Sequence, residues 1–340
     1  MRGDELRGTD AGRPVLSIVA PAFNEQDVVE RFHDRLGSVL QTLGCTAEIV
    51  YVNDGSTDET QTRLERLRAG DARVSIVELS RNFGKEAAMT AGLDAARGDA
   101  VIVIDVDLQD PPELIPRLVE EWQRGFDIVQ MRRAKRPGES AFKRGCAWAH
   151  YRLLNFLSSA PIPVDVGDFR LLSRRAVDAL RLLPERNRYM KGLFAWIGFP
   201  QRELVYERAP RAGGSTKWPL ARLLSLSFDG ITAFSTAPLR LASALGAAIA
   251  GVSFVFAAWV VTKTLLFGEP VRGFPTLMVT VLFLGGAQLL AIGILGEYLG
   301  RMFVETKQRP IYLVNRILPA AEAGTRSEPG DPIPFVRPGL

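Results

Sequence analysis

Two aspartates, Asp105 and Asp107, follow the apolar run at residues 101–104 (Val-Ile-Val-Ile). A run of β-branched residues predicts a strand buried on both faces, and Pro111 and Pro112 end it and can start a helix. With one residue between them, both carboxylates can face one hard cation. Oxygen ligands of this kind suit Mg²⁺ or Mn²⁺ carrying a diphosphate, because such ions keep positions open for phosphate oxygens. Asp-x-Asp alone is a weak signal; its place after a buried strand strengthens it.

The first half of the chain alternates strand-like and helical stretches. This alternation predicts an α/β fold with a mostly parallel sheet covered on both faces. Strands are expected at 15–20, 48–52, 74–79, 101–104 and 126–129, with helices at about 26–43, 58–68, 86–97 and 112–124. Ligands bind beyond the carboxyl ends of strands in such sheets. Polar residues gather at four of those ends, 21–25, 53–58, 80–85 and 105–107. Each segment alone is more simply a turn or a helix cap, but four together predict a nucleotide site.

Several other classes of site are disfavoured by composition. The chain has no Gly-x-Gly-x-x-Gly after the first strand and no Gly-x-x-x-x-Gly-Lys-Ser/Thr, so phosphate has to be held by a metal and basic side chains. Its two histidines argue against histidine catalysis and zinc. Its two cysteines argue against a disulfide framework and favour a reducing, cytosolic environment. A net charge of +4 without a basic block predicts no nucleic-acid partner.

Two long runs, 241–262 and 274–296, contain no charged residue. Each exceeds the roughly 20 residues that a helix needs to cross a bilayer, which predicts transmembrane helices at 239–264 and 274–298. A buried helix of a soluble protein is the alternative, and two runs in succession argue against it. Basic residues concentrate outside the pair, at Arg222, Arg240, Arg301, Lys307, Arg309 and Arg316, against Lys263 and Arg272 between them. The positive-inside rule then predicts a multi-pass protein of the inner membrane with both termini and the soluble domain cytoplasmic.

The rest of the chain is divided by composition. Residues 15–216 are expected to form the soluble catalytic domain, and the polar ends 1–14 and 319–340 are expected to be disordered. Helices lying in the membrane interface are predicted at 217–238, and an interfacial segment is predicted at 299–318. Core packing against the soluble domain is the alternative for both.

Segments 21–25, 53–58 and 105–112 resemble the hallmarks of family 2 glycosyltransferases with the GT-A fold, a Rossmann-like, mostly parallel sheet. More narrowly, residues 15–317 resemble the polyprenyl-phosphate glycosyltransferases, the group of dolichyl-phosphate mannose synthase. The GtrB-type bactoprenol glucosyltransferases are most similar, through 82–86, 167–171, 191–196, 214–218, 238–240 and 296–301. One departure is Val106, where relatives often have alanine; it leaves the two aspartates in place.

The resemblance implies a role for each matching residue. Donor binding would fall to Pro21, Ala22, Glu25, Asp54, Asp105, Asp107, Gln109 and Arg133, with Asp54 on the nucleobase. The metal, Mg²⁺ or Mn²⁺, would be held by Asp105, Asp107 and Gln109. The acceptor phosphate would meet Arg170, Arg211 and Lys217, and catalysis would depend on Asp107, Asp168 and Arg211. Two alternatives remain open: Arg211 and Lys217 can serve lipid headgroups, and Asp168 can orient the acceptor or sugar or simply pair with Arg170.

The same resemblance implies a function. The chain would be a metal-dependent hexosyltransferase that transfers glucose from UDP-glucose, with inversion, to a polyprenyl phosphate such as undecaprenyl phosphate. The product would serve cell-envelope glycan modification, for example of lipopolysaccharide. The implied partners are a nucleotide-sugar donor, a lipid acceptor and the membrane. The resemblance also implies a homo-oligomer, a tetramer. Alternatives are a GDP-mannose-dependent synthase and a non-catalytic membrane scaffold; a processive synthase would need a Gln-x-x-Arg-Trp motif, which this chain lacks.

Overall fold

The computed structural model describes residues 15–134, 166–183, 185–186, 188–207, 237–267 and 273–320. The chain forms two compact units. Of the described residues, 15–134, 166–183, 185–186, 188–207 and 310–320 belong to the first unit, and 237–267 and 273–309 belong to the second. The first unit therefore contains described residues from both before and after the second.

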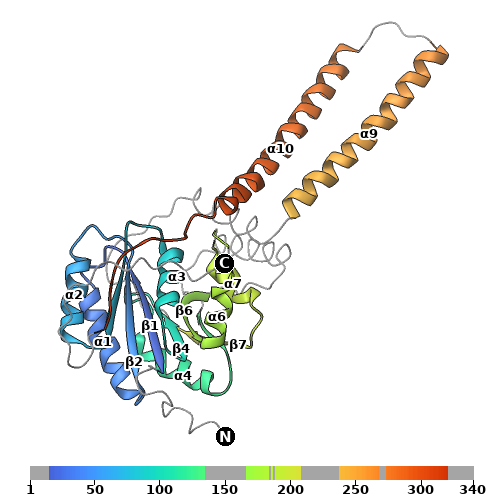
Figure 1. Ribbon diagram of the computed structural model, residues 1–340. Helices are drawn as coiled ribbons and strands as arrows, with labels where there is room; N and C mark the ends of the chain where they lie inside the picture. Colours follow the sequence, from blue (N-terminus) through green and yellow to red (C-terminus); the bar gives the residue numbers. More distant parts are fainter. Residues whose placement is uncertain are drawn as a thin grey trace. The chain divides into compact units, whose positions relative to one another are not determined.

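An α/β sheet with helices on both faces makes up the described part of the first unit (Figure 1). Its strands are β1 (Leu16–Ala22), β2 (Ala47–Asn53), β3 (Val74–Leu79), β4 (Ala100–Val103), β5 (Ile128–Arg133), β6 (Val166–Ser173), β7 (Gln201–Tyr206) and β8 (Val314–Leu318). Its helices are α1 (Val29–Thr42), α2 (Thr60–Gly70), α3 (Lys85–Ala95), the 3-10 turn η1 (Pro112–Leu114), α4 (Ile115–Gln123), α6 (Arg174–Arg181) and α7 (Met190–Trp196).

The strand order is β7-β5-β6-β4-β1-β2-β3-β8. Strands β1 to β4 run parallel to one another, β5 runs parallel to β7, and β6 and β8 are antiparallel to their neighbours. The predicted mostly parallel sheet is therefore confirmed. Because β6 is reversed, its amino end lies at the same edge as the carboxyl ends of β1, β2 and β4. This edge is where the candidate site forms.

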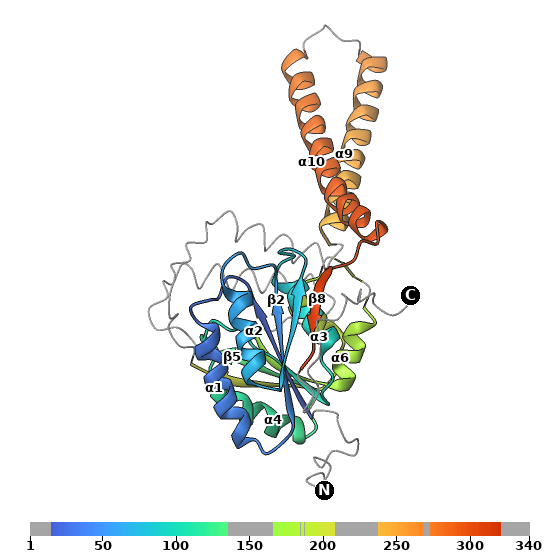
Figure 2. The same ribbon diagram turned by 60° about the vertical axis from the view of Figure 1, so that its left-hand side comes forward.

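Alternation of side chains along β1 divides the core into two layers. Leu16, Ile18 and Ala20 belong to the same buried cluster as Phe32 and Leu36 of α1. Figure 2 shows α1, α2 and α4 on one side of the sheet and α3 and α6 on the other. Helix α3 lies very close to the strands: a Cβ on Gly92 would come within 2.2 Å of Val19 Cγ1. Glycine is therefore required at position 92. The close packing that it allows sets the position of the first turn of α3 at the site.

Strand β8 differs from the sequence expectation of an interfacial segment over 299–318. Helix α10 (Phe274–Thr306) continues through the first part of that range, and residues 314–318 pair antiparallel with β3. Arg316 forms ion pairs with Glu78 of β3 and Glu65 of α2. Tyr312 donates a hydrogen bond to Asp94 Oδ2 over 2.8 Å. These polar partners explain why this stretch packs on the sheet domain, the alternative that the sequence left open.

Helices α9 (Ala237–Phe267) and α10 form the described part of the second unit and pack side by side (Figures 1 and 2). The expected transmembrane ranges, 239–264 and 274–298, lie within these helices. By length and composition, one segment of the described residues, Phe283–Thr306, is long and apolar enough to cross a membrane. The expected disordered ends at 1–14 and 321–340, and the expected interfacial helices at 217–236, lie outside the described residues.

Candidate functional site

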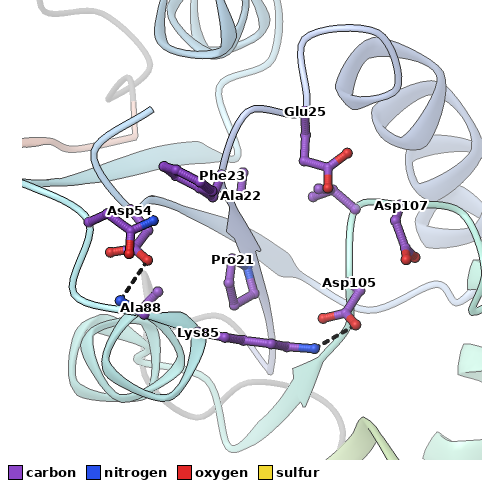
Figure 3. A pocket seen from close by; sticks show the side chains of 12 residues that line it. Pro21, Ala22, Phe23, Glu25, Asp54, Lys85, Ala88, Asp105 and Asp107 are labelled. Atoms are coloured by element: carbon purple, nitrogen blue, oxygen red, sulfur yellow. Dashed lines mark hydrogen bonds and ion pairs between the residues drawn. The ribbon is translucent and has the colours of Figure 1, made fainter. Parts of the chain in front are cut away.

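A cleft of about 250 Å³ opens at the edge of the sheet where β1, β2 and β4 end (Figure 3). Six residues that the sequence assigned to donor binding line it: Pro21, Ala22, Glu25, Asp54, Asp105 and Asp107. They come from three separate strand ends, and the parallel sheet brings them together. Phe23, Gly84 and Lys85 also line the cleft; they lie in the segments 21–25 and 80–85 that were expected at the site, but none of them was given a role of its own.

Asp54 anchors one end of the cleft. Its side chain is buried, and its two carboxylate oxygens accept hydrogen bonds from the backbone amides of Phe83 and Gly84 over 2.8 and 2.9 Å. Gly84 has a φ of 97°, a conformation that favours glycine. Burial raises the pKa of Asp54, and the two amides act against that shift. Asp54 therefore fixes the loop before α3, and its carboxylate retains lone pairs that can accept an N–H from a nucleobase.

Asp105 and Asp107 form the acidic end of the cleft, just beyond β4 (Figure 3). Asp105 is mostly buried, with 18% of its side chain exposed, and its Oδ2 lies 2.6 Å from Lys85 Nζ. Asp107 Oδ1 accepts a hydrogen bond from the backbone amide of Gln109 over 3.0 Å. That short turn passes through Leu108, whose φ is 59°. The turn fixes the side chain of Asp107. The other carboxylate oxygen of Asp107, Oδ2, has no hydrogen-bond donor among the described residues.

The residues at this end fit a divalent ion that binds together with a diphosphate. Within the described residues, no group of three or more His, Cys, Asp or Glu side chains could hold a metal by itself. Two carboxylates, with Gln109 next to them in sequence, are a typical protein share for Mg²⁺, because substrate phosphates and water supply the remaining oxygens. The open oxygen of Asp107 agrees with such a role. The roles of these residues stay predictions.

Asp168 reaches the same place from β6. In the antiparallel register, Val103 of β4 pairs with Arg170 of β6. Continuing that register by two residues sets Asp105 opposite Asp168. Lys85 lies between them, with Nζ 2.5 Å from Asp168 Oδ2. Burial alone would raise the pKa of Asp168, but Lys85 and then Lys191 hold it well below its usual range.

Arg170 lies behind this pair and not in the cleft. It is 1% exposed, its guanidinium carbon sits 3.8 Å from the centre of the Phe194 ring, and its Nη2 donates to the Gly167 carbonyl over 2.7 Å. Among the ion pairs of the described residues, the partner of Asp168 is Lys85 and not Arg170. The structural pairing of Asp168 that the sequence allowed therefore involves a different cation.

Arg133 lies at the end of β5, against the start of β6. A Cβ on Gly167 would come 3.0 Å from Arg133 Nη2, so a glycine leaves room for this guanidinium. Arg133 also bonds to Tyr206 of β7, whose hydroxyl donates to Asp110. Arg133 does not line the cleft described above. Arg211 and Lys217, the other expected cations, lie outside the described residues.

Sequence reasoning missed the charged side chains that surround Asp168. Lys85 was part of the polar segment 80–85, but nothing in that segment alone gave it a partner. Glu86 and Lys191 lie in segments that carry the family resemblance, but they received no role of their own, because their proximity to Asp168 depends on how α3, β6 and α7 pack. Burial lowers the pKa of Lys191, and its neighbours Arg170 and Arg133 lower it further against the pull of Asp168.

The Glu86 carboxyl predicts a pH-dependent stability. Burial, with Asp168 adding to it, raises the pKa of Glu86 to about 7, above the ordinary value of 4.5. The folded state then binds this proton more tightly than the unfolded state. The stabilisation is fully present below about pH 4.5 and is lost as pH rises through 7. We expect the Glu86→Gln variant to lack this loss. Its thermal unfolding midpoint should therefore rise relative to that of the wild type as the pH increases from about 4.5 to 7.

Thermal unfolding of both proteins across that pH range measures the effect. Glu120→Gln, on an exposed position of α4, serves as the control and should follow the wild type. If the Glu86→Gln and wild-type midpoints run parallel at every pH, Glu86 does not titrate in this way.

Comparison with known proteins finds similarity to glycosyltransferases. Residues 17–181 match the family model for glycosyl transferase family 2. An SfII prophage-derived bactoprenol glucosyl transferase of Shigella flexneri is 46% identical over 301 residues, which cover 88% of this chain and 97% of that protein. An uncharacterized glycosyltransferase of Synechocystis is 47% identical, covering 88% and 94%. The solved structure of Mycobacterium tuberculosis glucosyl-3-phosphoglycerate synthase with Mn²⁺, UDP-glucose and glycerol 3-phosphate is 24% identical, covering 67% and 81% with a TM-score of 0.45.

Proposed function

Since the chain belongs to glycosyltransferase family 2, we propose that it transfers a sugar from a nucleotide donor to a polyprenyl phosphate. Glucose and UDP-glucose are the favoured sugar and donor. The Shigella relative is named a bactoprenol glucosyl transferase, and the present chain is similar to it over nearly its whole length. The observation that carries the proposal is the cleft itself, where Asp54, Asp105 and Asp107 from two strand ends face one space.

The donor would lie along the cleft with its two ends held differently. Asp54 would receive the nucleobase, beside Pro21, Ala22 and Glu25. Asp105, Asp107 and Gln109 would hold Mg²⁺ or Mn²⁺. When bound, the ion would neutralise charge on the diphosphate as the sugar leaves. This division would put the sugar next to Asp168, because Asp168 and Asp105 share the Lys85 ammonium.

One displacement accounts for the reaction. An oxygen of the lipid phosphate attacks the anomeric carbon, the new carbon–oxygen bond forms, and the bond to the donor diphosphate breaks. The bonding electron pair leaves with the nucleoside diphosphate, and the anomeric configuration inverts. A phosphate monoester is already largely ionised near neutral pH, so no strong base is required. The protein's contribution is alignment of two anions and neutralisation of charge.

A transfer assay tests this proposal. The purified full-length protein in lipid nanodiscs is supplied with Mg²⁺, undecaprenyl phosphate and a radiolabelled sugar nucleotide, UDP-glucose or GDP-mannose in turn. Label should move from UDP-glucose into the organic-soluble lipid. Transfer only from GDP-mannose would favour the mannose synthase alternative. Neither transfer nor donor hydrolysis with any sugar nucleotide would favour the non-catalytic scaffold and contradict the proposal.

We further propose that both α9 and α10 cross the membrane, with the sheet domain on the cytoplasmic side. Strand β7 precedes α9 and strand β8 follows α10, and both strands belong to the same sheet. A chain that leaves a domain on one side of a membrane and returns to it crosses the membrane an even number of times. If α10 crosses, a second crossing is required. The uncharged run 241–262 within α9 supports that helix as the second.

Labelling of introduced cysteines tests this topology. In a background with Cys45 and Cys146 replaced by serine, we expect Glu269→Cys to react with a membrane-impermeant maleimide in intact cells, because residue 269 lies between the helices. Asp10→Cys and Ser327→Cys should react only after the cells are permeabilised. Labelling of either terminal cysteine in sealed cells would contradict a cytoplasmic sheet domain.

A further inference from the structure

Two carboxylates of like charge face each other across β4 and β6. The register of these antiparallel strands ends at Val103 and Arg170, and two further residues along it Asp105 comes opposite Asp168. Both side chains are largely shielded from water, at 18% and 17% exposed. Like charges placed directly opposite on neighbouring strands repel each other, and shielding from water strengthens the repulsion. Such a pair needs a cation between its members.

Lys85 supplies that cation from a third element. Its ammonium lies 2.6 Å from Asp105 Oδ2 and 2.5 Å from Asp168 Oδ2. Figure 3 shows its side chain extending across the cleft to Asp105. Burial acts to lower the pKa of Lys85, but the two carboxylates outweigh it and raise that pKa above its usual value.

The backbone of Lys85 is held as firmly as its ammonium. Lys85 is the first residue of α3, and the two residues before it, Phe83 and Gly84, donate their amides to Asp54. Helix α3 is itself seated close to the sheet through Gly92. One short segment, 83–85, thus touches Asp54 at one end of the cleft and the Asp105–Asp168 pair at the other. A lysine anchored at both ends can hold a carboxylate in a defined position.

We propose that Lys85 is a positioning residue, which fixes the Asp168 carboxylate beside Asp105 so that Asp168 faces the sugar and the incoming acceptor phosphate. This inference rests on the proposed transfer reaction and adds to it a residue that neither the sequence motifs nor the relatives' names assign. Without the ammonium, Asp168 would turn away from Asp105 to relieve the repulsion. Small misplacements of this kind can slow catalysis about 100-fold.

A double-mutant cycle tests the proposal. We expect Lys85→Met, which keeps the length of the side chain and removes its charge, to lower kcat for transfer about 100-fold. Asp168→Asn should also lower kcat. If Lys85 acts through Asp168, adding Lys85→Met to Asp168→Asn should change kcat by no more than about twofold. Lys85→Arg should restore part of the activity, because it keeps the charge.

Two measurements separate positioning from donor binding and from loss of structure. Calorimetry of UDP with Mn²⁺ should give similar affinities for Lys85→Met and the wild type, within about twofold. Arg35→Met, which breaks an exposed ion pair between α1 and Glu113, should leave both kcat and affinity unchanged. The thermal unfolding midpoints of the same cycle report the Lys85–Asp168 contact without any turnover.

Three outcomes would overturn the proposal: unchanged kcat in Lys85→Met, losses that multiply in the double variant, or a loss of UDP affinity as large as the loss of kcat. Failure of the underlying function looks different, because the wild type itself would then transfer no sugar to the lipid. In that case the thermal unfolding midpoints still test the Lys85–Asp168 contact. Changes in midpoint that add in the double variant contradict the contact, and changes that do not add support it.

Discussion

Asp107→Ala is expected to abolish sugar transfer, lowering turnover by a factor of about 10³ or more, since charge neutralisation by a bound ion is worth several kcal/mol. Asp107 lines the cleft, is held by the turn to Gln109, and keeps one oxygen without a hydrogen-bond donor among the described residues. Asp105, the other carboxylate, is already engaged by Lys85. Removing Asp107 thus takes away the carboxylate that is freest to hold an ion, and the donor diphosphate loses its counter-charge.

Binding of the ion itself is the direct measurement. Electron paramagnetic resonance of Mn²⁺ titrated with UDP should show a large loss of affinity in Asp107→Ala, while circular dichroism stays native. Asp34→Ala, on an exposed position of α1, is the matched control and should behave as the wild type. Full transfer by Asp107→Ala, or undiminished transfer by the wild type in excess EDTA, would show that the reaction needs no metal at this site.

The parallel part of the sheet could be predicted because its strands have a clear local pattern. Runs such as residues 101–104 are apolar throughout, as expected for strands covered on both faces. In a parallel sheet all such strands end at one edge, so the residues after each run had to meet. For this reason Asp54, Asp105 and Asp107 could be grouped from the amino-acid sequence alone, and the cleft contains all three.

The antiparallel strands could not be predicted in the same way. β6 and β8 are joined to their neighbours by long connections, and their direction depends on tertiary packing. Because the reversed direction of β6 could not be predicted, Asp168 was assigned to the site only by resemblance. The sequence left open whether it orients the acceptor or sugar or pairs with Arg170. In the structure Asp168 forms an ion pair with Lys85, a residue 83 positions earlier in the chain. Residues 314–318 could not be predicted as a strand of this sheet either, because they pair with β3, a segment far away in the chain. Ion pairs of Arg316 with Glu78 and Glu65 help to hold them there.

The acceptor should depend on Arg211, which the resemblance matches to a basic residue of the family and which precedes the first apolar run. A lipid phosphate enters from the plane of the membrane, so a cation that meets it should lie in the sequence next to the membrane segment. Two cations in the described sheet domain serve other groups: Lys85 holds Asp105 and Asp168, and Arg170 is buried against Phe194. We therefore expect Arg211→Ala to slow transfer by about 3 kcal/mol in barrier terms, the scale of one lost oxyanion contact.

Donor binding should suffer less than turnover in this variant, because Asp54, Asp105 and Asp107 all remain. The comparison is UDP affinity by calorimetry with Mn²⁺ beside kcat and KM for undecaprenyl phosphate. A matched change, Arg211→Lys, keeps the charge and should retain more activity than alanine, although lysine lacks the two-pronged hydrogen bonding of arginine to phosphate. If Arg211→Ala loses as much UDP affinity as turnover, the arginine serves the donor diphosphate, and the cation for the lipid phosphate has to be sought at Lys217.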